Sequence, residues 1–436
     1  MGIPGLTLVP LAGEGWHKGD DYLTLNVWTP DPGARGLPVM VFIYGGGFIV
    51  GGSSTPLYNG ERFAQDGVVL ISFNYRLGIE GFLPLAGGDT NLGIRDQIAA
   101  LTWVQQNITA FGGDPHNVTI FGQSAGAICV ATLLAAPSAQ GLFCRAISQS
   151  GGAEYSMSMD QASRFASRLG ELAGVEPTRE GFAALTHEQL IAAQMRSRPS
   201  LFDPAAAQDA DPADGVLAFM PVRDGDVLPE PPIDAIRHGA TSSVEVLAGT
   251  TSQELNLEYT LSGLLTHLGE RQLQESLGAR FPEHSALLDA YRAAYPQARP
   301  GELYSAIMGD WTFWMPTIRL AEARAAARGA SYLYQFAWPS PTLGGQLGAC
   351  HALELGFVFD TLDAPELAGP SGLIGEQPPA DLARQMHQAW TAFATTGNPG
   401  WAPYDLQQRL VMRIDTDWSL LANPRADLRL SWETRR

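Results

Sequence analysis

Short apolar runs rich in β-branched residues recur along the chain and predict the strands of a sheet. Most of these runs are apolar at both alternating positions, which is typical of strands that are covered on both faces. Such strands belong to a mostly parallel sheet with helices on each side. The runs lie at residues 23–28, 39–44, 68–73, 118–121, 145–150, 244–249, 331–336 and 410–414.

Segments with helical patterns lie between these runs. Residues 96–108 carry apolar side chains at helical spacing and end near "FGGDP", which favours the end of a helix. Residues 317–329 are rich in alanine and end in glycine, and residues 380–400 end in a stretch that contains glycine and proline. The alternation predicts an α/β fold with a central, mostly parallel sheet of about eight or more strands flanked by helices.

Two longer stretches, residues 155–235 and 255–320, interrupt this alternation. Both are mainly helical in pattern, and the first contains the loop "DPAAAQDADPADG". Because both lie between predicted strands, we expect helical insertions that cover one end of the sheet. Residues 1–436 are therefore expected to form a single α/β domain.

The composition indicates a globular protein, and its acidic charge argues against a nucleic-acid partner. Of the 436 residues, 45% are hydrophobic and 17% are charged, which is typical of a globular chain. The chain has 27 basic and 45 acidic residues, a net charge of -18. Such a chain repels a polyanion, so we expect no nucleic-acid partner.

The N-terminal stretch and the cysteines favour a cytoplasmic protein. "MGIPGLTLVP" has no cationic segment followed by an apolar core, so it does not resemble a secretion signal. The apolar runs are too short to cross a bilayer, and no membrane partner is expected. Cys129, Cys144 and Cys350 do not provide a disulfide framework or the paired spacing of a zinc site.

The pentapeptide "GQSAG" at residues 122–126 is the first candidate for chemistry. It follows an apolar run and precedes the helical stretch "AGAICVATLLAA". In a nucleophile elbow, a strained turn between strand and helix exposes the serine hydroxyl, and the side chains two residues before and after it would collide. Gly122 and Gly126 remove that collision, which makes Ser124 a candidate nucleophile.

A glycine run follows the apolar run at 39–44. In "FIYGGGFIVGG" the glycines allow backbone N–H groups to approach a substrate closely. Such donors stabilise the oxyanion of a tetrahedral intermediate. A phosphate-binding loop would need Gly-Lys-Ser/Thr, and this run contains no lysine.

In these and other motifs, the sequence resembles the type B carboxylesterases, the family of para-nitrobenzyl esterases and cholinesterases. The resemblance rests on "DDYLTLNVWTP", "YGGGF", "NYRLGIEGFL", the block from Asn91 to Gly126, "SQSG", "GTTSQE" and "GACHALELGFVF". It implies an α/β-hydrolase fold and a Ser-Glu-His triad in that chain order. It also implies an oxyanion hole, here Gly46, Gly47 and Ala125.

The acid and the base are expected after later strands of that fold. Glu254 follows the run at 244–249; Glu258 and Asp310 are competing acids, and the neighbours of Glu254 differ from the usual Asp-Glu-Gly. Among eight histidines, His351 follows the run at 331–336, whereas His387 sits in a helical pattern. We therefore expect Glu254 and His351 to complete the triad.

These residues predict a serine carboxylesterase that hydrolyses small-molecule esters through an acyl-enzyme and needs no metal or organic cofactor. We expect a monomer or weak homo-oligomer. One alternative is a hydrolase of the same family specialised for carbamates, amides, pyrethroids or toxin esters. Another is a non-catalytic adhesion-type relative, although such relatives typically lose a triad member and this chain keeps all three.

Departures from the family pattern suggest further properties. Gln123 stands where many members have glutamate, so we expect a weaker preference for cationic substrates. The segment before residue 23 is short, and a more open site that accepts bulkier esters is expected. By resemblance, Arg76 and Asp96 form a buried structural ion pair.

Four aromatic residues have two interpretations. Phe48, Trp311, Phe313 and Trp314 lie near the site in the sequence pattern. They could line an apolar acyl or alcohol pocket, or they could belong to the core. The sequence leaves both interpretations open.

Overall fold

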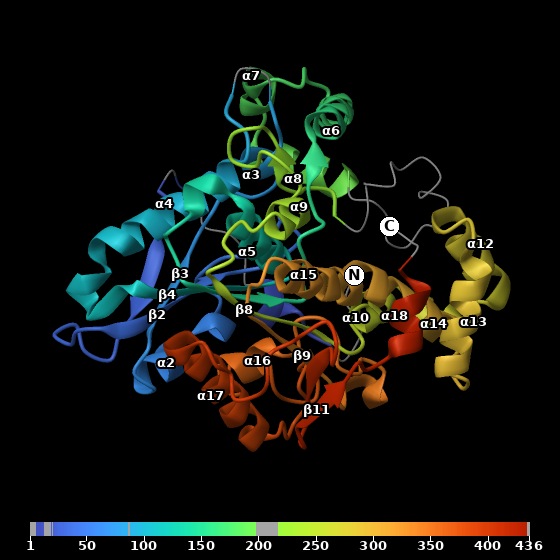
Figure 1. The fold of residues 1–436 in the computed structure, drawn as a ribbon. Helices are drawn as coiled ribbons and strands as arrows, with labels where there is room; N and C mark the ends of the chain where they lie inside the picture. Colours follow the sequence, from blue (N-terminus) through green and yellow to red (C-terminus); the bar gives the residue numbers. More distant parts are fainter. Residues whose placement is uncertain (1–5, 13–18, 20, 86–87, 198–216, 434–436) are drawn as a thin grey trace.

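A nine-stranded sheet forms the centre of the computed structural model, which describes residues 6–12, 19, 21–85, 88–197 and 217–433 (Figure 1). Within this part of the chain the strand order is β1-β3-β2-β4-β5-β8-β9-β10-β11. The strands are β1 (Leu25–Trp28), β2 (Leu37–Ile43), β3 (Val69–Phe73), β4 (Gly113–Gln123), β5 (Arg145–Gln149), β8 (Glu245–Thr251), β9 (Ser331–Phe336), β10 (Leu410–Ile414) and β11 (Ser419–Ala422).

The sheet is parallel from β3 to β10, and only its two edge strands are antiparallel to their neighbours. Each apolar run in the sequence corresponds to one strand, so the predicted mostly parallel sheet is confirmed. The edge strand β11 was not predicted, because it is only four residues long and its positions alternate between partly buried and exposed.

Burial explains why the runs are apolar at every position. All five residues of β3 are buried, and Val39 to Ile43 of β2 are completely shielded from solvent. Helices cover both faces of these strands, so neither face has a polar set of positions. The hydrophobic effect of this burial supplies the main driving force for the fold.

Helices cover the two faces of the sheet in separate groups (Figure 1). One group lies above the sheet in the view and the other below it, in agreement with their packing contacts. The upper group contains α4 (Leu92–Asn107), α5 (Ala125–Ala135), α9 (Pro232–Arg237) and α15 (Met315–Ala326). The lower group contains α2 (Glu61–Gln65), α16 (Leu355–Val358) and α17 (Ala380–Thr396).

Helix α5 begins directly after Ser124 and is buried along its whole length. A helix that is apolar all round is stable only inside a core. It packs against β4 and β5 on one side and against α9 on the other. The helix is therefore fixed by packing, which in turn fixes the turn that precedes it.

The two inserted stretches differ in structure. Residues 155–235 contain α6 (Met159–Ala173), α7 (Arg179–Ala183) and α8 (His187–Ser197). They also contain the strands β6 (Met157–Ser158) and β7 (Val222–Arg223), which pair in parallel and were not predicted. The loop "DPAAAQDADPADG" lies outside the described residues.

The second stretch, 255–320, is helical as expected from its pattern. It is made of α10 (Asn256–Leu261), α11 (Leu264–His267), α12 (Glu270–Arg280), α13 (His284–Ala294) and α14 (Pro300–Gly309), followed by a π-helical segment (Asp310–Trp314) and the start of α15. The remaining helices are α1 (Val9–Ala12), α3 (Gly78–Phe82) and α18 (Ala426–Ser431).

The predicted ion pair between Arg76 and Asp96 is present. Two guanidinium nitrogens of Arg76 lie 2.8 and 2.6 Å from the Asp96 carboxylate, and the backbone N–H of Arg76 donates to the same group at 3.0 Å. The Asp96 side chain is only 8% exposed. The pair joins the segment after β3 to helix α4, which supports its interpretation as a structural contact.

Candidate active site

Five neighbouring parallel strands, β2, β4, β5, β8 and β9, end at the same edge of the sheet. The loops after these strands carry the glycine run, Ser124, Ser150, Glu254 and His351. The carboxyl ends of parallel strands are the usual place for a site in an open α/β sheet. Residues that are far apart in the sequence therefore meet at one edge.

Ser124 occupies a strained turn between β4 and α5. Its backbone has φ 57° and ψ -125°, a conformation that non-glycine residues rarely adopt. Its N–H donates to the carbonyl of Gln149 at 2.8 Å, which ties the turn to the end of β5. The turn lifts the serine side chain out of the sheet at the N-terminus of the buried helix α5.

The glycines on either side of Ser124 are required by space. A Cβ on Gly122 would lie 2.6 Å from the carbonyl group of Gly126. A Cβ on Gly126 would lie 2.0 Å from the carbonyl oxygen of Ile43. Both distances are far below van der Waals contact, so the small residues of "GQSAG" allow the chain to reverse this tightly.

His351 and Glu254 form a close pair. His351 Nδ1 lies 2.6 Å from Glu254 Oε2, and the backbone N–H of His351 donates to the carbonyl of Glu254 at 3.2 Å. The Glu254 side chain is 3% exposed and the His351 side chain 12% exposed. The structure thus brings together the acid and the histidine that are 97 residues apart in sequence.

The second oxygen of Glu254 is also held. Glu254 Oε1 accepts hydrogen bonds from Ser150 Oγ at 2.7 Å and from the N–H of Thr251 at 2.8 Å. Both carboxylate oxygens therefore have partners, as a buried charge requires. Ser150 belongs to the family marker "SQSG", but its contact with Glu254 was not predicted, because a lone serine has no signal of its own.

Gln253 connects the loops that carry Glu254 and His351. Its N–H donates to the carbonyl of Ala349 at 2.9 Å, and its Oε1 accepts from the N–H of Ala349 at 2.8 Å. This residue is one of the departures from the usual Asp-Glu-Gly. Here the glutamine side chain fixes the loop of His351 against the loop of Glu254.

The carboxylate changes the protonation of the imidazole. Burial alone would lower the pKa of His351, but the charge of Glu254 and its hydrogen bond raise that pKa to about 9. Glu354, which is completely buried, has its pKa raised to about 7 by burial and by the charge of Glu254. The imidazolium form is therefore favoured beside this group of carboxylates.

Ser124 is the next residue after Gln123, which contacts this pair, but Ser124 itself has no hydrogen bond to it among the described residues. Among the described residues, no group bonds to Ser124 Oγ. His351 Nε2 instead lies 3.1 Å from Nε2 of Gln123, the residue before the serine. This contact of Gln123 was not predicted, because nothing in a sequence shows which way the side chain at the end of a strand turns.

The expected oxyanion donors lie in the loop after β2 and at the start of α5. Gly46 and Gly47 have φ values of 113° and 63°, which favour glycine, and Ala125 is the first residue of α5. Within the described residues, the N–H groups of these three donate to no other backbone group. A Cβ on the preceding Gly45 would lie 3.0 Å from Ser124 Cβ, so this loop runs directly beside the serine.

Of the four aromatic residues, Phe313 has a ring contact with the histidine of the pair. Phe313 lies in the π-helical segment with its ring centroid 4.6 Å from that of His351. Phe48 is fully buried and packs against Phe82, so it belongs to the core. Trp311 packs against Phe281.

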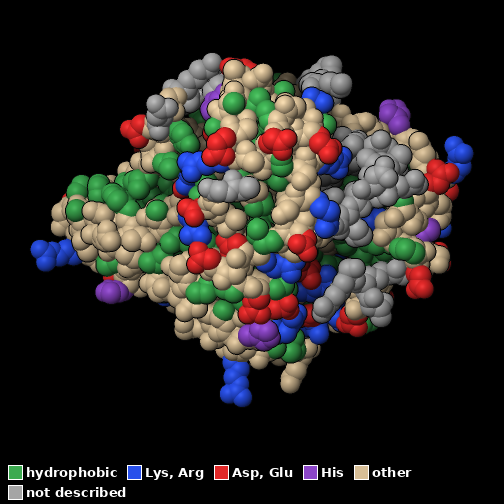
Figure 2. Space-filling view, turned by 90° about the horizontal axis from the view of Figure 1, so that it is seen from above, with side chains coloured by type: hydrophobic (Ala, Val, Ile, Leu, Met, Phe, Trp, Pro, Cys, Tyr) green, Lys and Arg blue, Asp and Glu red, His purple; other side chains and the backbone are tan. Residues whose placement is uncertain are grey.

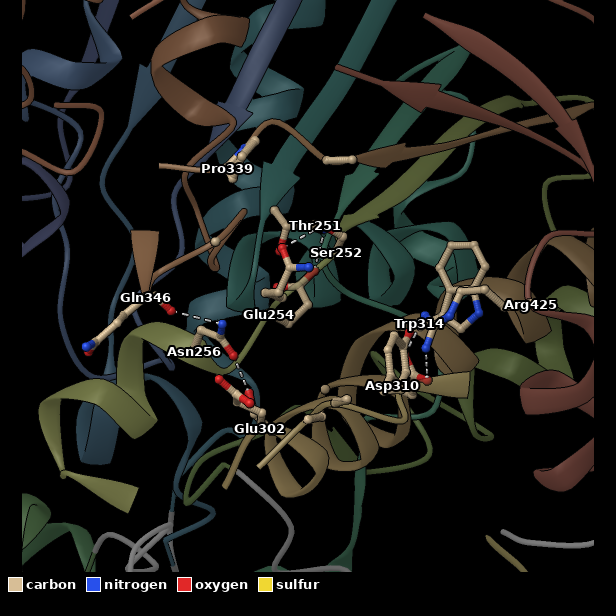
Figure 3. Close-up of a pocket in the computed structure, with 18 of the residues that line it drawn as sticks. Thr251, Ser252, Glu254, Asn256, Glu302, Asp310, Trp314, Pro339, Gln346 and Arg425 are labelled. Atoms are coloured by element: carbon tan, nitrogen blue, oxygen red, sulfur yellow. Dashed lines mark hydrogen bonds and ion pairs between the residues drawn. The ribbon is translucent and has the colours of Figure 1, made fainter. Parts of the chain in front are cut away.

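A pocket of about 480 Å³ is lined by Glu254 and Trp314, among other residues (Figure 3). Arg425 also lines it and binds Asp310 through two hydrogen bonds of 2.9 and 2.5 Å. Neither Ser124 nor His351 lines this pocket. Of the three triad candidates, the pocket is therefore lined by the acid alone.

The competing candidates of the sequence analysis have other positions. Asp310 is bound by Arg425, as described above, and His387 Nδ1 lies 2.7 Å from the carbonyl of Val358. Glu258 lies on α10 and contributes through its charge to the raised pKa of His351. Neither Asp310 nor His387 joins the pair.

Acidic and arginine side chains are mixed on the face shown in Figure 2. No continuous basic patch is visible there, in agreement with the net charge of -18. Across the described ranges, no helix has the length and apolar character needed to span a bilayer. Over the same ranges, no three His, Cys, Asp or Glu side chains gather in a group suited to a metal ion.

Comparisons with known proteins extend over nearly the whole chain. The model of the carboxylesterase family matches residues 8–428. The chain is 35% identical over 430 residues to the para-nitrobenzyl esterase of Bacillus subtilis, covering 95% of this chain and 83% of that protein. It is 36% identical to the phenmedipham hydrolase of Pseudarthrobacter oxydans, covering 87% of this chain and 74% of that protein.

A solved structure shows the same similarity. The carboxylesterase of Geobacillus stearothermophilus superposes with a TM-score of 0.82 at 35% identity, covering 95% of this chain and 86% of that one. This agreement confirms the α/β-hydrolase fold. The chain belongs to the carboxylesterase family and is a carboxylic ester hydrolase.

Proposed function

We propose that this protein is a serine carboxylesterase in which Ser124 is the nucleophile, His351 the general base and Glu254 the acid of the triad. The observation that carries the proposal is the hydrogen bond of 2.6 Å between His351 Nδ1 and Glu254 Oε2. This pair lies at the sheet edge where the strained turn exposes Ser124. The single α/β-hydrolase domain supplies all three residues.

The proposed reaction begins with attack of Ser124 Oγ on the ester carbonyl. His351 Nε2 accepts the serine proton, and Glu254 holds the proton on Nδ1 and stabilises the imidazolium. The N–H groups of Gly46, Gly47 and Ala125 donate to the oxyanion. The alcohol leaves with the proton from His351, and water then hydrolyses the acyl-enzyme by the same route.

The arrangement of the donors supports this assignment. The loop with Gly46 and Gly47 packs beside the serine turn, and Ala125 lies at the positive end of the buried helix α5. Removal of one such donor lowers the rate about 10²–10³-fold in a serine hydrolase. These residues and the triad form one continuous site on five neighbouring loops.

A fluorophosphonate probe tests the proposal directly. We expect the label on Ser124 in the native protein and no label in Ser124→Ala, together with loss of para-nitrophenyl acetate hydrolysis. Ser148→Ala is a matched control, since Ser148 is buried on β5 and, within the described ranges, its hydroxyl contacts the carbonyl of Ala127 at 3.5 Å and no other group. Labelling of any other residue would contradict the assignment.

We propose carboxylic esters as the substrates, and the specialised alternative is a hydrolase of carbamates or amides. A panel of neutral esters of increasing chain length, extended to carbamates and amides, separates a general carboxylesterase from a specialised hydrolase. Hydrolysis confined to carbamates or amides would favour the second. Hydrolysis of no substrate would favour the adhesion-type alternative.

We also propose a cytoplasmic location and a monomer or weak homo-oligomer. Cys129, Cys144 and Cys350 are free thiols, and two of them are buried, which agrees with a reducing compartment. Cell fractionation tests the location, and size-exclusion chromatography tests the oligomeric state.

A further inference from the structure

The imidazole of His351 has one lone pair available in its neutral form. A carboxylate can only accept hydrogen bonds, so the contact of 2.6 Å with Glu254 places the proton on Nδ1. Nε2 is then the acceptor. The group that lies 3.1 Å from it is the amide nitrogen of Gln123, which can only donate.

The neighbouring residue in the chain, Ser124, is the donor that catalysis requires at the same lone pair. Among the described residues, Ser124 Oγ makes no hydrogen bond, and Nε2 of His351 is already satisfied by Gln123. The two donors come from consecutive residues. They therefore compete for a single acceptor.

The position of Gln123 is fixed by the sheet. It is the last residue of β4, lies opposite Gln149 of β5 in the parallel register, and is 4% exposed. Its side chain runs along Gly45, where a Cβ would come within 3.2 Å of Gln123 Oε1. The amide is thus confined beside the imidazole and cannot turn to bulk solvent.

We propose that Gln123 is a positioning residue that holds the imidazole of His351 when it is in its neutral form, the form that acts as base, and that Ser124 replaces the Gln123 amide at Nε2 before acylation. This inference rests on the proposed function. It assigns Gln123 a regulatory effect on the rate of acylation, which neither the family membership nor the triad implies.

The other groups around His351 affect its charge or cover its ring, whereas the amide of Gln123 contacts Nε2. Glu254 after β8, Glu258 on α10 and Glu354 before α16 are the charged groups that affect the imidazole. Phe313 covers a face of the ring and has no polar atom to offer. The amide of Gln123 is in hydrogen-bond contact with Nε2 at 3.1 Å.

The Gln123 amide can also form a hydrogen bond with His351 after the imidazole is protonated. When the proton moves from Ser124 Oγ to His351 Nε2, the imidazolium becomes a donor at that atom. A half-turn of the amide end of Gln123 presents Oε1, which accepts from the imidazolium. The proton then passes to the leaving alcohol, and the amide neither gains nor loses a proton.

The test measures the second-order rate of fluorophosphonate labelling at Ser124. In Gln123→Met a side chain of similar length has no donor, so Nε2 is available to the serine. We expect the labelling rate to rise about two- to tenfold, the effect of removing one ordinary hydrogen bond. In Gln123→Glu a permanent acceptor favours the imidazolium, so the rate at neutral pH falls and the acid limb of the pH profile moves to higher pH.

The two variants separate this inference from loss of structure and from failure of the proposed function. An unchanged or slower rate in Gln123→Met with an unchanged melting temperature would overturn it. If Gln123→Met unfolds, an acid limb that does not move in Gln123→Glu would overturn it instead. Labelling of a residue other than Ser124 refutes the proposed function, whereas correct labelling without these rate changes refutes only the role of Gln123.

Discussion

Ser150 Oγ donates a hydrogen bond of 2.7 Å to Glu254 Oε1, while Glu254 Oε2 binds His351. The acid is therefore held from both oxygens. In Ser150→Ala the carboxylate keeps only the Thr251 N–H on that side, and a hydrogen bond to a charged group is lost. We expect kcat/KM to fall roughly tenfold with little change in KM.

Steady-state kinetics with a neutral para-nitrophenyl ester check the effect of Ser150→Ala. Ser148→Ala, two residues earlier and on β5, is the control, since within the described part of the chain that hydroxyl makes a long contact of 3.5 Å with a carbonyl and no contact with Glu254. Equal losses in both variants would indicate a general effect on β5.

The pH profile depends on the pair of His351 and Glu254. The imidazole accepts the serine proton only when it is neutral, and Glu254 raises the pKa of His351 to about 9. We therefore expect kcat/KM to decrease as the pH falls through that region. In Glu254→Gln the charge is removed, so the pKa of His351 falls and the acid limb moves to lower pH, while the plateau is roughly 10³–10⁴-fold lower.

Profiles of kcat/KM between mildly acidic and alkaline pH check this prediction for both proteins. The acid limb moves to lower pH in Glu254→Gln because the negative charge of Glu254 favours the imidazolium and its removal lowers the pKa of His351. An acid limb at the same pH in both proteins would show that Glu254 does not set the protonation of the base.

The turn at Ser124 is expected to tolerate no side chain at Gly126. A Cβ there would lie 2.0 Å from the carbonyl oxygen of Ile43. Overpacking of this kind costs about 1–3 kcal/mol, and here it also displaces the nucleophile. Gly126→Ala should lower both the melting temperature and the activity.

Gly88→Ala is the matched control for Gly126→Ala. A Cβ on Gly88, an exposed residue, meets no atom closer than 3.7 Å. Thermal unfolding and esterase activity of the two variants provide the comparison. Normal activity in Gly126→Ala would mean that the turn can relax without moving Ser124.

The Arg76–Asp96 pair is expected to contribute to stability. The Asp96 side chain is 8% exposed, and its loss leaves the Arg76 guanidinium without its partner. Removal of one member of a buried pair costs about 3–5 kcal/mol. Since Arg76 remains 27% exposed, we expect Asp96→Ala to lie near the lower end of that range.

Urea unfolding checks the loss in Asp96→Ala. Asp381→Ala is the control, because the Arg384–Asp381 pair is 59% and 80% exposed and such pairs contribute about 0–1 kcal/mol. An equally small loss in both variants would contradict the structural role of the Arg76 pair.

Gln123 places a neutral amide beside the nucleophile, so we expect no strong preference for cationic substrates. Butyrylcholine and its neutral 3,3-dimethylbutyl isostere should have comparable kcat/KM values. In Gln123→Glu the new charge should favour the cationic ester several-fold, since charges a few ångströms apart interact by a few kcal/mol at most near a protein surface. A strong choline preference of the unmodified protein would contradict this prediction.

Much of the site could be predicted because its signals are local. Gly122 and Gly126, two residues before and after Ser124, must be small for the turn to form, and the glycine run must follow a strand. The positions of Glu254 and His351 required the resemblance to a family as well, because a lone acid or histidine in a loop has no pattern. The structure brings these two together but does not itself show a bond from His351 to Ser124.

The sequence by itself determined the sheet, since strands covered on both faces must be apolar at every position, and β3 shows this most clearly. It also determined the tight turn at Ser124 through the volumes of its neighbours. Only the tertiary structure decided the contacts between loops: Ser150 on Glu254, Phe313 on His351, and Gln123 at Nε2. These depend on side-chain direction at the ends of different strands, and no spacing along one chain encodes a direction in space.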